Sequence, residues 1–409
     1  LRSLLASLAL THTPREVQFF CLDFGGGALR ALDGLPHLSG VAGRRDAEAV
    51  RRTVAEVVTV IDQREARFAE LGIDSISAYR RRRAAGEFAD DPFGDVFLVV
   101  DGWATLRQDY EELEQTVTNI AARGLGYGVH VILTAARWSE VRINMRDLLG
   151  TRLELRLGDP NESEIDRRAA ANVPEKAPGR GLTKDKFHFL AAVSRLDGRS
   201  EVQDLAEATA ELVKQIAAAW SGPPAPKVRL LPQRLPAGEL ARMVDRSAPG
   251  IPIGVNEAAL APVSLDFASE PHFMVFGDAE CGKTNLLRLI ARSIVERYTP
   301  AEARIVIADY RRGLLGAIEG DHLLDYAPSA QAFSEGLASI RSAMQNRLPG
   351  PDVTPAQLRD RSWWRGPELY ILVDDYDLVA TAGSNPLTVL MDLLPQARDI
   401  GLHLILTRR

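Results

Sequence analysis

The stretch from Val275 to Leu289, VFGDAECGKTNLLRL, constrains the fold of this chain more than any other. It reads as a short apolar strand, a tight loop and the start of an amphipathic helix. The loop from Gly277 to Thr284 has a glycine, four further residues, and then glycine, lysine and threonine. Its backbone amides, at the positive end of the helix dipole, suit an anion such as phosphate. The sequence therefore predicts a nucleotide-binding domain organised around this loop.

Each residue type in the loop has a predicted role. Gly277 and Gly282 permit backbone angles that a Cβ would block. Lys283 supplies a positive charge for the β- and γ-phosphates, and the hydroxyl of Thr284 is placed to bind Mg²⁺. We therefore expect ATP and Mg²⁺ as cofactors; the alternative is an ordinary glycine-rich turn. The residues expected to contact the nucleotide are Gly277, Asp278, Ala279, Glu280, Cys281, Gly282, Lys283, Thr284 and Asn285.

A second segment, residues 369–375 (LYILVDD), has the composition of a buried parallel strand that ends in carboxylates. Asp374 is predicted to hold Mg²⁺ through water. Asp375 lies where hydrolytic motors place the acidic residue that orients the attacking water, although Asp has a shorter reach than the more usual Glu. Asp375 and Lys283 are therefore the candidate catalytic residues. The alternative for both carboxylates is an acidic turn without chemistry.

The chain contains two copies of one pattern. Residues 1–32 align with residues 287–318, so that Asp309 lies 286 positions after Asp23. In a second block, Asp374 lies 273 positions after Asp101. By this offset the phosphate loop of the first copy would precede residue 1, so we expect it outside this chain. We also expect the second copy to be incomplete at its end.

The alternation of strands and helices predicts two tandem RecA-like P-loop domains of the α/β class, each a mostly parallel sheet flanked by helices. The expected division is 1–220 for a degenerate first domain, 221–250 for a linker or extended tie, and 251–409 for the second domain. In the first domain Asp101 is either a degenerate metal ligand or a plain turn residue. Gly102 follows it without a carboxylate, so we expect weak or no hydrolysis there.

Bulk properties exclude several classes of protein. With 46% hydrophobic and 25% charged residues the composition is that of a soluble globular protein, and the net charge of −6 makes a nucleic-acid partner unlikely on electrostatic grounds. Cys21 and Cys281 give no disulfide framework or metal motif. No apolar run approaches the ~20 residues that a transmembrane helix needs. Since the chain begins without Met, we interpret it as a piece of a longer polypeptide.

Two further features have more than one interpretation. The run from Arg80 to Arg83 is either a solvated face or a contact for a subunit or polyanion. Trp363 and Trp364 either pack under a loop or stack on a base or nucleotide; we expect packing.

Three segments together resemble one family: GDAECGKTNLLR, RSWWRGPELYILVDDYDLV and DVFLVVDGWATLRQDYEEL. They resemble the EccC component of type VII (ESX) secretion systems, within the FtsK/SpoIIIE class of motor ATPases. The resemblance covers nearly the whole chain, in the order of the last two of three tandem ATPase domains.

This resemblance implies an ATPase at the cytoplasmic face of the inner membrane that works as a hexameric ring with other secretion-complex subunits. It implies secreted substrates of the WXG type, which are helical hairpins recognised by a C-terminal signal. It also implies a polar sensor and an arginine after the last strand, so Arg408 and Arg409 are candidate sensors. Two rivals remain: a DNA translocase, whose activity would depend steeply on salt, and a nucleotide-gated binding scaffold with little hydrolysis.

Overall fold

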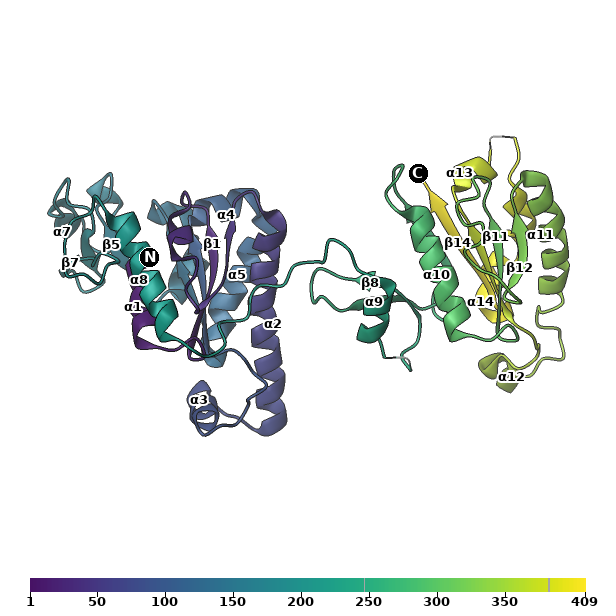
Figure 1. Ribbon diagram of the computed structural model, residues 1–409, viewed down its shortest axis with the longest axis horizontal. Helices are drawn as coiled ribbons and strands as arrows, with labels where there is room; N and C mark the ends of the chain where they lie inside the picture. Colours follow the sequence, from purple (N-terminus) through teal and green to yellow (C-terminus); the bar gives the residue numbers. More distant parts are fainter. Residues whose placement is uncertain (246, 382) are drawn as a thin grey trace. The chain divides into compact units, whose positions relative to one another are not determined.

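The computed structural model describes residues 1–245, 247–381 and 383–409. These residues form two compact units, which are labelled in Figure 1 and are described separately. Unit 1 comprises Leu1–Leu230 with Glu257–Ala259, and unit 2 comprises Leu231–Asn256 with Leu260–Arg409. The change of unit after Leu230 falls within the stretch 221–250.

Unit 1 is built on a four-stranded parallel sheet with the order β2-β1-β3-β4. Along β1, Phe20 and Leu22 face one core while Phe19 and Cys21 face the other. Burial on both faces explains why this strand is a continuous apolar run rather than an alternating one. The strands are β1 (Val17–Asp23), β2 (Leu38–Gly43), β3 (Asp95–Asp101) and β4 (Val129–Leu133).

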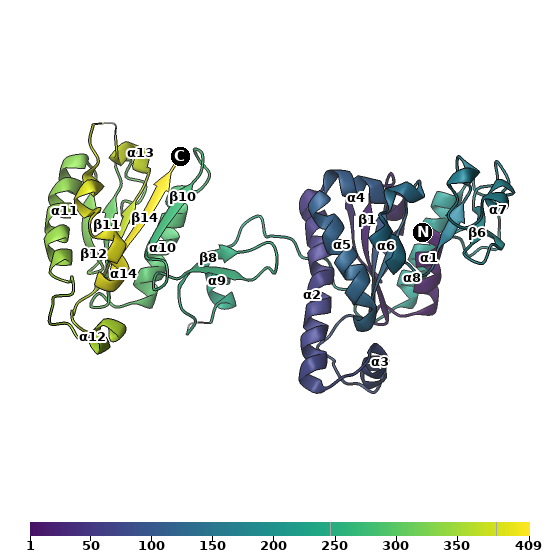
Figure 2. The same ribbon diagram turned by 180° about the vertical axis from the view of Figure 1, so that it is seen from behind.

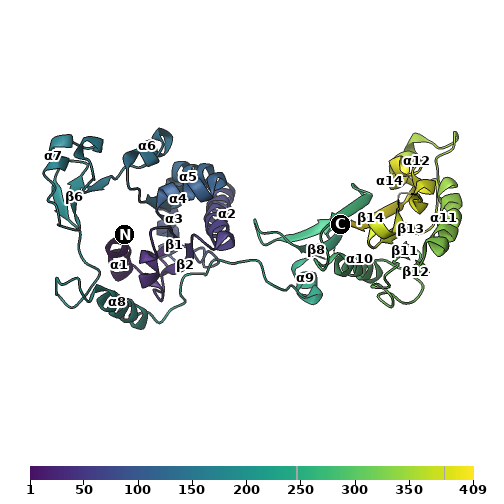
Figure 3. The same cartoon turned by 90° about the horizontal axis from the view of Figure 1, so that it is seen from above.

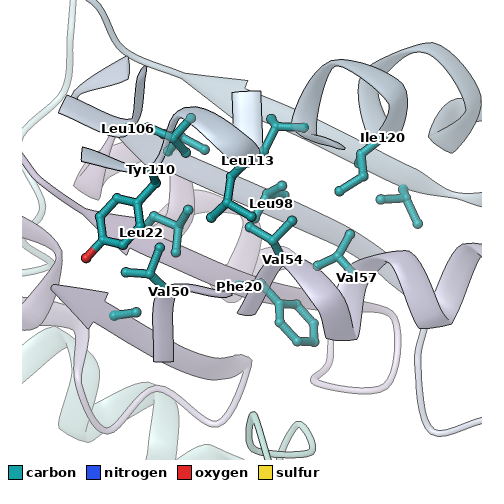
Figure 4. Packing of buried hydrophobic residues seen from close by; sticks show 14 of the residues in the cluster. Phe20, Leu22, Val50, Val54, Val57, Leu98, Leu106, Tyr110, Leu113 and Ile120 are labelled. Atoms are coloured by element: carbon teal, nitrogen blue, oxygen red, sulfur yellow. The ribbon is translucent and has the colours of Figure 1, made fainter. Parts of the chain in front are cut away.

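Helices cover both faces of this sheet, as the views in Figures 2 and 3 show. One layer contains α2 (Ala47–Leu71), α4 (Trp103–Asp109) and α5 (Glu111–Arg123), whose apolar side chains meet those of the strands in the core of Figure 4. The other layer contains α1 (Arg2–Thr11), α8 (Leu205–Ala219) and the 3-10 helix Ala28–Leu32. Each layer lies against one set of alternating strand residues.

Two stretches that read as single helices from the sequence, 46–82 and 105–123, are each interrupted in the structure. The helical stretch 46–82 is divided because Gly72, with φ 60°, ends α2, and the side chain of Ser75 then caps α3 (Ile76–Ala84). The stretch 105–123 is divided at Tyr110, between α4 and α5.

A smaller antiparallel sheet, with the order β5-β6-β7, lies between α6 and α8 in the sequence. β6 occupies the end of the proline- and glycine-rich stretch 173–183, which reads as a loop from its composition. Pairing on both edges overrides that local preference. The elements are α6 (Ile143–Leu148), β5 (Leu153–Leu155), α7 (Arg167–Ala171), β6 (Arg180–Thr183) and β7 (His188–Leu190), with 3-10 turns at Gly124–Tyr127, Trp138–Glu140 and Pro160–Glu162.

The chain after α8 runs in extended form beside β2. Ala225 donates its backbone N–H to the Pro36 carbonyl at 2.7 Å, and Val228 donates to the Ser39 carbonyl at 3.1 Å. This part of the stretch 221–250 is therefore an extended tie to unit 1. The short helix α9 (Ala237–Met243) then opens unit 2.

Unit 2 is built on a five-stranded parallel sheet with the order β10-β14-β13-β11-β12. Helix α10 (Lys283–Arg297) packs on one face, and α11 (Ala330–Gln345) with α14 (Ala397–Ile400) packs on the other. The strands are β10 (His272–Phe276), β11 (Ala303–Ala308), β12 (Leu323–Ala327), β13 (Glu368–Val373) and β14 (Leu402–Arg408). The remaining elements are the hairpin β8 (Ile251–Val255) and β9 (Pro262–Leu265), α12 (Pro355–Asp360), α13 (Tyr376–Val379), and 3-10 turns at Pro386–Leu390 and Leu394–Gln396.

The two sheets share one arrangement, because β2-β1-β3-β4 in unit 1 corresponds to β12-β11-β13-β14 in unit 2. Strand β10, which leads into the phosphate loop, has no counterpart beside β4 among the described residues. The predicted α/β fold with parallel sheets flanked by helices is confirmed. No helix in the described ranges is both long and apolar enough to cross a bilayer.

Candidate functional site

The loop from Gly277 to Thr284 joins β10 to α10 and has the shape of an anion cradle. Gly277 does not have a positive φ, and a Cβ there would lie 2.4 Å from Sγ of Cys281, so a larger residue would require that exposed side chain to move. Gly282 and Glu280 turn the chain with φ values of 100° and 62°. In the described part of the chain, the backbone N–H groups of residues 279–282 have no protein hydrogen-bond partner. These amides are therefore available to an anion at the N-terminus of a 15-residue helix.

Lys283 is held inside the curve of this loop. Its Nζ donates hydrogen bonds to the carbonyl oxygens of Gly277 and Asp278, each at 2.7 Å, and the residue is only 8% exposed. The ammonium is thereby placed at the centre of the cradle, where the sequence pattern requires a cation.

Asp374 and Thr284 lie in direct contact, 90 residues apart in the sequence. The Thr284 hydroxyl donates to Oδ2 of Asp374 at 2.6 Å, and the Thr407 hydroxyl donates to Oδ1 at 2.8 Å. Asp374 is 4% exposed, so both oxygens of a buried carboxylate are fixed in position. β13 delivers the aspartate and β14 delivers Thr407, from neighbouring positions in the sheet.

The Thr284 hydroxyl and the Asp374 carboxylate suit Mg²⁺, a hard cation that takes hydroxyl, carboxylate, water and phosphate oxygens. No group of three or more His, Cys, Asp or Glu side chains with metal-binding geometry exists within residues 1–245, 247–381 and 383–409. A magnesium ion held by Thr284 and Asp374 would therefore depend on substrate phosphates and water for its other ligands, as is usual for this ion.

Asp375 occupies a constrained turn immediately after β13. Its φ is 50°, and its backbone N–H donates to Oγ1 of Thr407 at 2.8 Å. Its carboxylate oxygen Oδ2 lies 3.0 Å from Nε of Arg311, in the loop after β11. The carboxylate is thus at the edge of the site, in an ion pair that no sequence pattern indicates.

Arg408 and Arg409, the candidate sensors, lie at the end of β14 and contact acidic side chains. Nε of Arg408 lies 3.0 Å from Asp377, and Nε of Arg409 lies 3.3 Å from Asp278 in the phosphate loop. The Arg409 backbone N–H also binds Asp377, and this hydrogen bond lowers the pKa of that carboxyl group below its usual range. Thr407, which directly precedes Arg408, is the residue at this end of β14 that contacts Asp374, through its hydroxyl group.

The remaining predicted residues lie on the exposed rim of the loop or on α10. Ala279, Glu280 and Cys281 are exposed. Oδ1 of Asn285, on the first turn of α10, is 3.4 Å from Nη1 of Arg288. These positions are near the cradle, and no hydrogen bond among the described residues links them to Asp374.

Asp101 in unit 1 is held by the threonine equivalent to Thr407, whereas Thr284 has no counterpart among the described residues of that unit. The Thr134 hydroxyl donates to Oδ1 of Asp101 at 2.6 Å, and the Gly102 N–H donates to Oγ1 of Thr134 at 2.9 Å. A Cβ at Gly25 would lie 2.3 Å from the other carboxylate oxygen, so the loop backbone approaches Asp101 closely. The described residues of unit 1 contain neither a phosphate loop nor a carboxylate at position 102.

Three residues that shape the site were missed from the sequence: Thr407, Asp309 and Arg311. The repeat contains a signal for two of them, because Thr134 and Asp23 stand at the equivalent positions of the first copy. For Arg311 the equivalent residue is Gly25, so the repeat gives no signal.

The tryptophan pair packs at the opposite end of the sheet, as expected. Nε1 of Trp363 donates to the Arg347 carbonyl at 2.7 Å, and Nε1 of Trp364 donates to the Asp399 carbonyl at 2.8 Å. The Arg347 guanidinium lies 4.2 Å from the centre of the Trp364 ring. These contacts lie before the amino ends of β13 and β14, away from Asp374.

The arginine run is largely engaged inside unit 1. Arg80 forms a bidentate pair with Asp95, Arg82 pairs with Glu87, and Arg83 bonds to backbone carbonyls. It borders a hollow of about 660 Å³ at the amino ends of β1 and β3. The hollow is therefore at the end of the sheet opposite Asp101.

Comparison with known proteins gives consistent matches over the chain. Residues 1–198 match the FtsK/SpoIIIE family. The chain is 60% identical over 408 residues to the ESX secretion system protein EccC of Thermomonospora curvata, covering 100% of this chain and 31% of that protein. It is 42% identical over 424 residues to the ESX-1 secretion system protein EccCb1 of Mycolicibacterium smegmatis, covering 100% of this chain and 70% of that protein. The chain thus spans about a third of the length of the first of these relatives.

Solved structures match the same region. ATPases 2 and 3 of Thermomonospora curvata EccC, in complex with a signal sequence peptide, align with a TM-score of 0.92 at 59% identity, covering 100% of this chain and 73% of that one. ATPases 2 and 3 of EssC from Geobacillus thermodenitrificans align with a TM-score of 0.63 at 21% identity, over 100% of this chain and 75% of that one. At that identity the second match shows likeness of fold alone.

Proposed function

This chain belongs to the EccC family of FtsK/SpoIIIE-type ATPases, and we propose that it binds and hydrolyses ATP as part of a type VII protein secretion motor. The observation that carries the proposal is the hydrogen bond of 2.6 Å between Thr284 and Asp374, beside a loop whose amides are free of partners in the described part of the chain. A strand-to-helix turn without function would not need a buried carboxylate fixed against the first turn of its helix.

In the proposed reaction, residues 277–284 bind the phosphates through backbone amides and Lys283. Thr284 and Asp374 would hold Mg²⁺, which when bound neutralises charge on the β- and γ-phosphates. Thr407 keeps Asp374 in place by its hydrogen bond to Oδ1. Asp375 is the proposed residue for orienting the attacking water.

For the partners we propose what the family relationship suggests. The related EccC structure holds a signal sequence peptide, which supports recognition of secreted proteins by a signal segment. We propose that these substrates are WXG-type helical hairpins, that the chain works in a hexameric ring with other secretion subunits, and that it acts at the cytoplasmic face of the cell membrane. The net charge of −6 favours this over DNA as the translocated polymer.

Two observations favour a second candidate, a nucleotide-gated scaffold with slow hydrolysis. Asp375 is paired with Arg311 at 3.0 Å, and the equivalent position of unit 1 is Gly102. Turnover measured with and without a multimeric substrate separates the two: a motor is stimulated, and a scaffold stays slow while binding nucleotide.

The direct test is Lys283→Ala, with Lys214→Ala on the exposed face of α8 as the control. We expect Lys283→Ala to weaken ATP binding about a hundredfold, since it removes charge-assisted hydrogen bonds to two phosphates. Isothermal titration with MgATP measures it. Equal affinities for the parent and Lys283→Ala would overturn the assignment of this site.

A further inference from the structure

The loop from Asp309 to Leu314, between β11 and β12, lies over the contact between Thr284 and Asp374. A Cβ at Gly313 would be 3.0 Å from Cγ2 of Thr284 and 3.9 Å from Oδ2 of Asp374. The Arg288 guanidinium, on α10, donates to the Gly313 carbonyl at 2.6 Å. The loop is thus attached to the helix that follows the phosphate loop.

Arg311 extends from this loop toward the carboxyl end of β13. Its Nε lies 3.0 Å from Oδ2 of Asp375, and its side chain is 69% exposed. Since the guanidinium side of this pair is open to solvent while the Asp375 side chain is 23% exposed, solvent screens the attraction and the guanidinium can exchange its partner at little cost. Asp375 directly follows Asp374, which places the guanidinium next to the predicted position of the terminal phosphate.

Asp309, whose carboxylate anchors this loop, has fewer hydrogen bonds to loop amides than its counterpart Asp23 in unit 1. In unit 1, both oxygens of Asp23 accept loop amides, from Gly27 at 3.0 Å and from Leu29 at 2.8 Å. In unit 2, the equivalent Asp309 is 0% exposed, and its Oδ2 accepts from the Leu314 amide at 2.6 Å.

Oδ1 of Asp309 has no hydrogen-bond partner within the described residues, although it is buried. Burial and the hydrogen bond to Asp309 raise the pKa of Tyr326 to about 12, so that phenol stays a neutral donor to Oδ2. A buried carboxylate oxygen without a partner is costly, and a shift of the Gly313 amide to the place that Gly27 takes in unit 1 would satisfy it. The Gly313 amide is therefore the donor that a movement of this loop would bring to Oδ1 of Asp309.

From these observations we infer that Arg311 reads the terminal phosphate of the nucleotide: it leaves Asp375 for the γ-phosphate of ATP, and ADP offers it no partner. This inference rests on the proposed nucleotide site at residues 277–284. Arg311 then acts within the same chain as its phosphate loop, and its departure frees the carboxylate of Asp375.

The test compares ATP and ADP affinities, with Mg²⁺, in the chain of residues 1–409 by isothermal titration. Arg311→Ala loses ATP affinity about tenfold, the size expected for one charge-assisted contact, while ADP affinity changes less than about twofold. Arg311→Lys retains part of the preference for ATP, because it keeps the charge but not the guanidinium fork. Arg312→Ala, which removes the same charge from the neighbouring position, leaves the ratio of the two affinities unchanged.

A second pair of variants separates direct phosphate contact from an effect through Asp375. In an Asp375→Asn background, Arg311→Ala still lowers the preference for ATP by the same factor. If the effect disappears in that background, or if Arg312→Ala matches Arg311→Ala, the inference is wrong. If the parent binds ADP and ATP but Arg311→Ala keeps the parental ratio, only this inference fails; if the parent binds neither, the proposed nucleotide site fails as well.

Discussion

At the scale of single residues, the site depends on carboxylates whose positions are fixed by hydroxyl groups. Asp374 is held between Thr284 and Thr407, and Asp101 in unit 1 is held by Thr134 in the same way. A threonine at the carboxyl end of β4 in unit 1 and of β14 in unit 2 therefore holds the aspartate in both copies of the fold. The threonine hydroxyl also accepts a hydrogen bond from the backbone N–H of the residue that follows the aspartate, which is Asp375 in unit 2 and Gly102 in unit 1.

Thr407→Val tests this arrangement at constant shape. The change leaves Oδ1 of Asp374 buried without a donor, which costs about 1–3 kcal/mol in the folded state and disturbs the aspartate. We expect the affinity for MgATP to fall about tenfold, measured by isothermal titration.

Thr134→Val is the matched control, since it removes the same contacts from unit 1 alone. It should leave MgATP affinity unchanged. Equal losses in both variants would mean that the effect is one of general stability and not of the site.

The sequence predicted the residues whose roles follow from local spacing. The loop 277–284 and Asp374 are identified by pattern alone, because glycine, lysine and threonine have fixed positions in a phosphate loop. Arg311 was missed because its partner, Asp375, is 64 positions away and the pair exists only through the adjacency of β11 and β13. Thr407 was missed because threonine is common in strands for its β-branched shape alone, so a single threonine near a strand end does not indicate a site.

At the scale of elements, the same threonine–glutamate turn precedes β1 in unit 1 and β11 in unit 2. The backbone N–H and hydroxyl of Thr13 donate to Glu16 before β1, at 2.7 and 2.9 Å. Thr299 does the same for Glu302 before β11, at 2.8 Å in both cases. The hydrogen bonds from the threonine backbone lower the pKa of each glutamate below its usual value.

The pH dependence of stability follows from the direction of these pKa shifts. A carboxyl group whose pKa is lower in the folded chain binds its proton less readily there than in the unfolded chain. Its contribution is complete above about pH 5 and is lost as the pH falls through the pKa of the folded state. Glu302→Gln should therefore flatten the acid branch of the melting temperature against pH, measured between about pH 6 and 3.

Glu319→Gln is the control for this prediction, because Glu319 is an exposed glutamate of the same unit outside the Thr299–Glu302 turn. If both variants have the same acid branch, the Thr299–Glu302 turn does not contribute.

The broken helices 46–82 and 105–123 show the limit of prediction at this scale. Periodicity identifies a helical stretch, while a single glycine or tyrosine decides where one helix ends and the next begins.

At the scale of the whole chain, the parallel sheets and their helical layers were predictable from the repeat. The extended tie was expected within 221–250, but its position along β2 and the pairing of the small sheet β5-β6-β7 were not predictable, because both are determined by pairing partners and not by composition. The structure contains one phosphate loop in its described residues, and this loop belongs to unit 2.

Hydrogen exchange tests that asymmetry. A ligand that binds only the folded state adds about 2.7 kcal/mol to the free energy of unfolding at a concentration about 100 times its Kd. We expect MgATP to slow amide exchange in α10, β13 and β14 of unit 2, with smaller changes in β1 and β3 of unit 1. Stronger protection in unit 1 would contradict the account.

The most direct measurement is the number of nucleotides bound by the chain of residues 1–409 at saturating MgATP, by equilibrium dialysis with the Lys283→Ala variant beside the parent. The account predicts about one nucleotide per parent chain and a large loss of binding in the variant at the same concentration. No nucleotide on the parent, or the same number on the variant, would contradict the claim that residues 277–284 and Asp374 form the site.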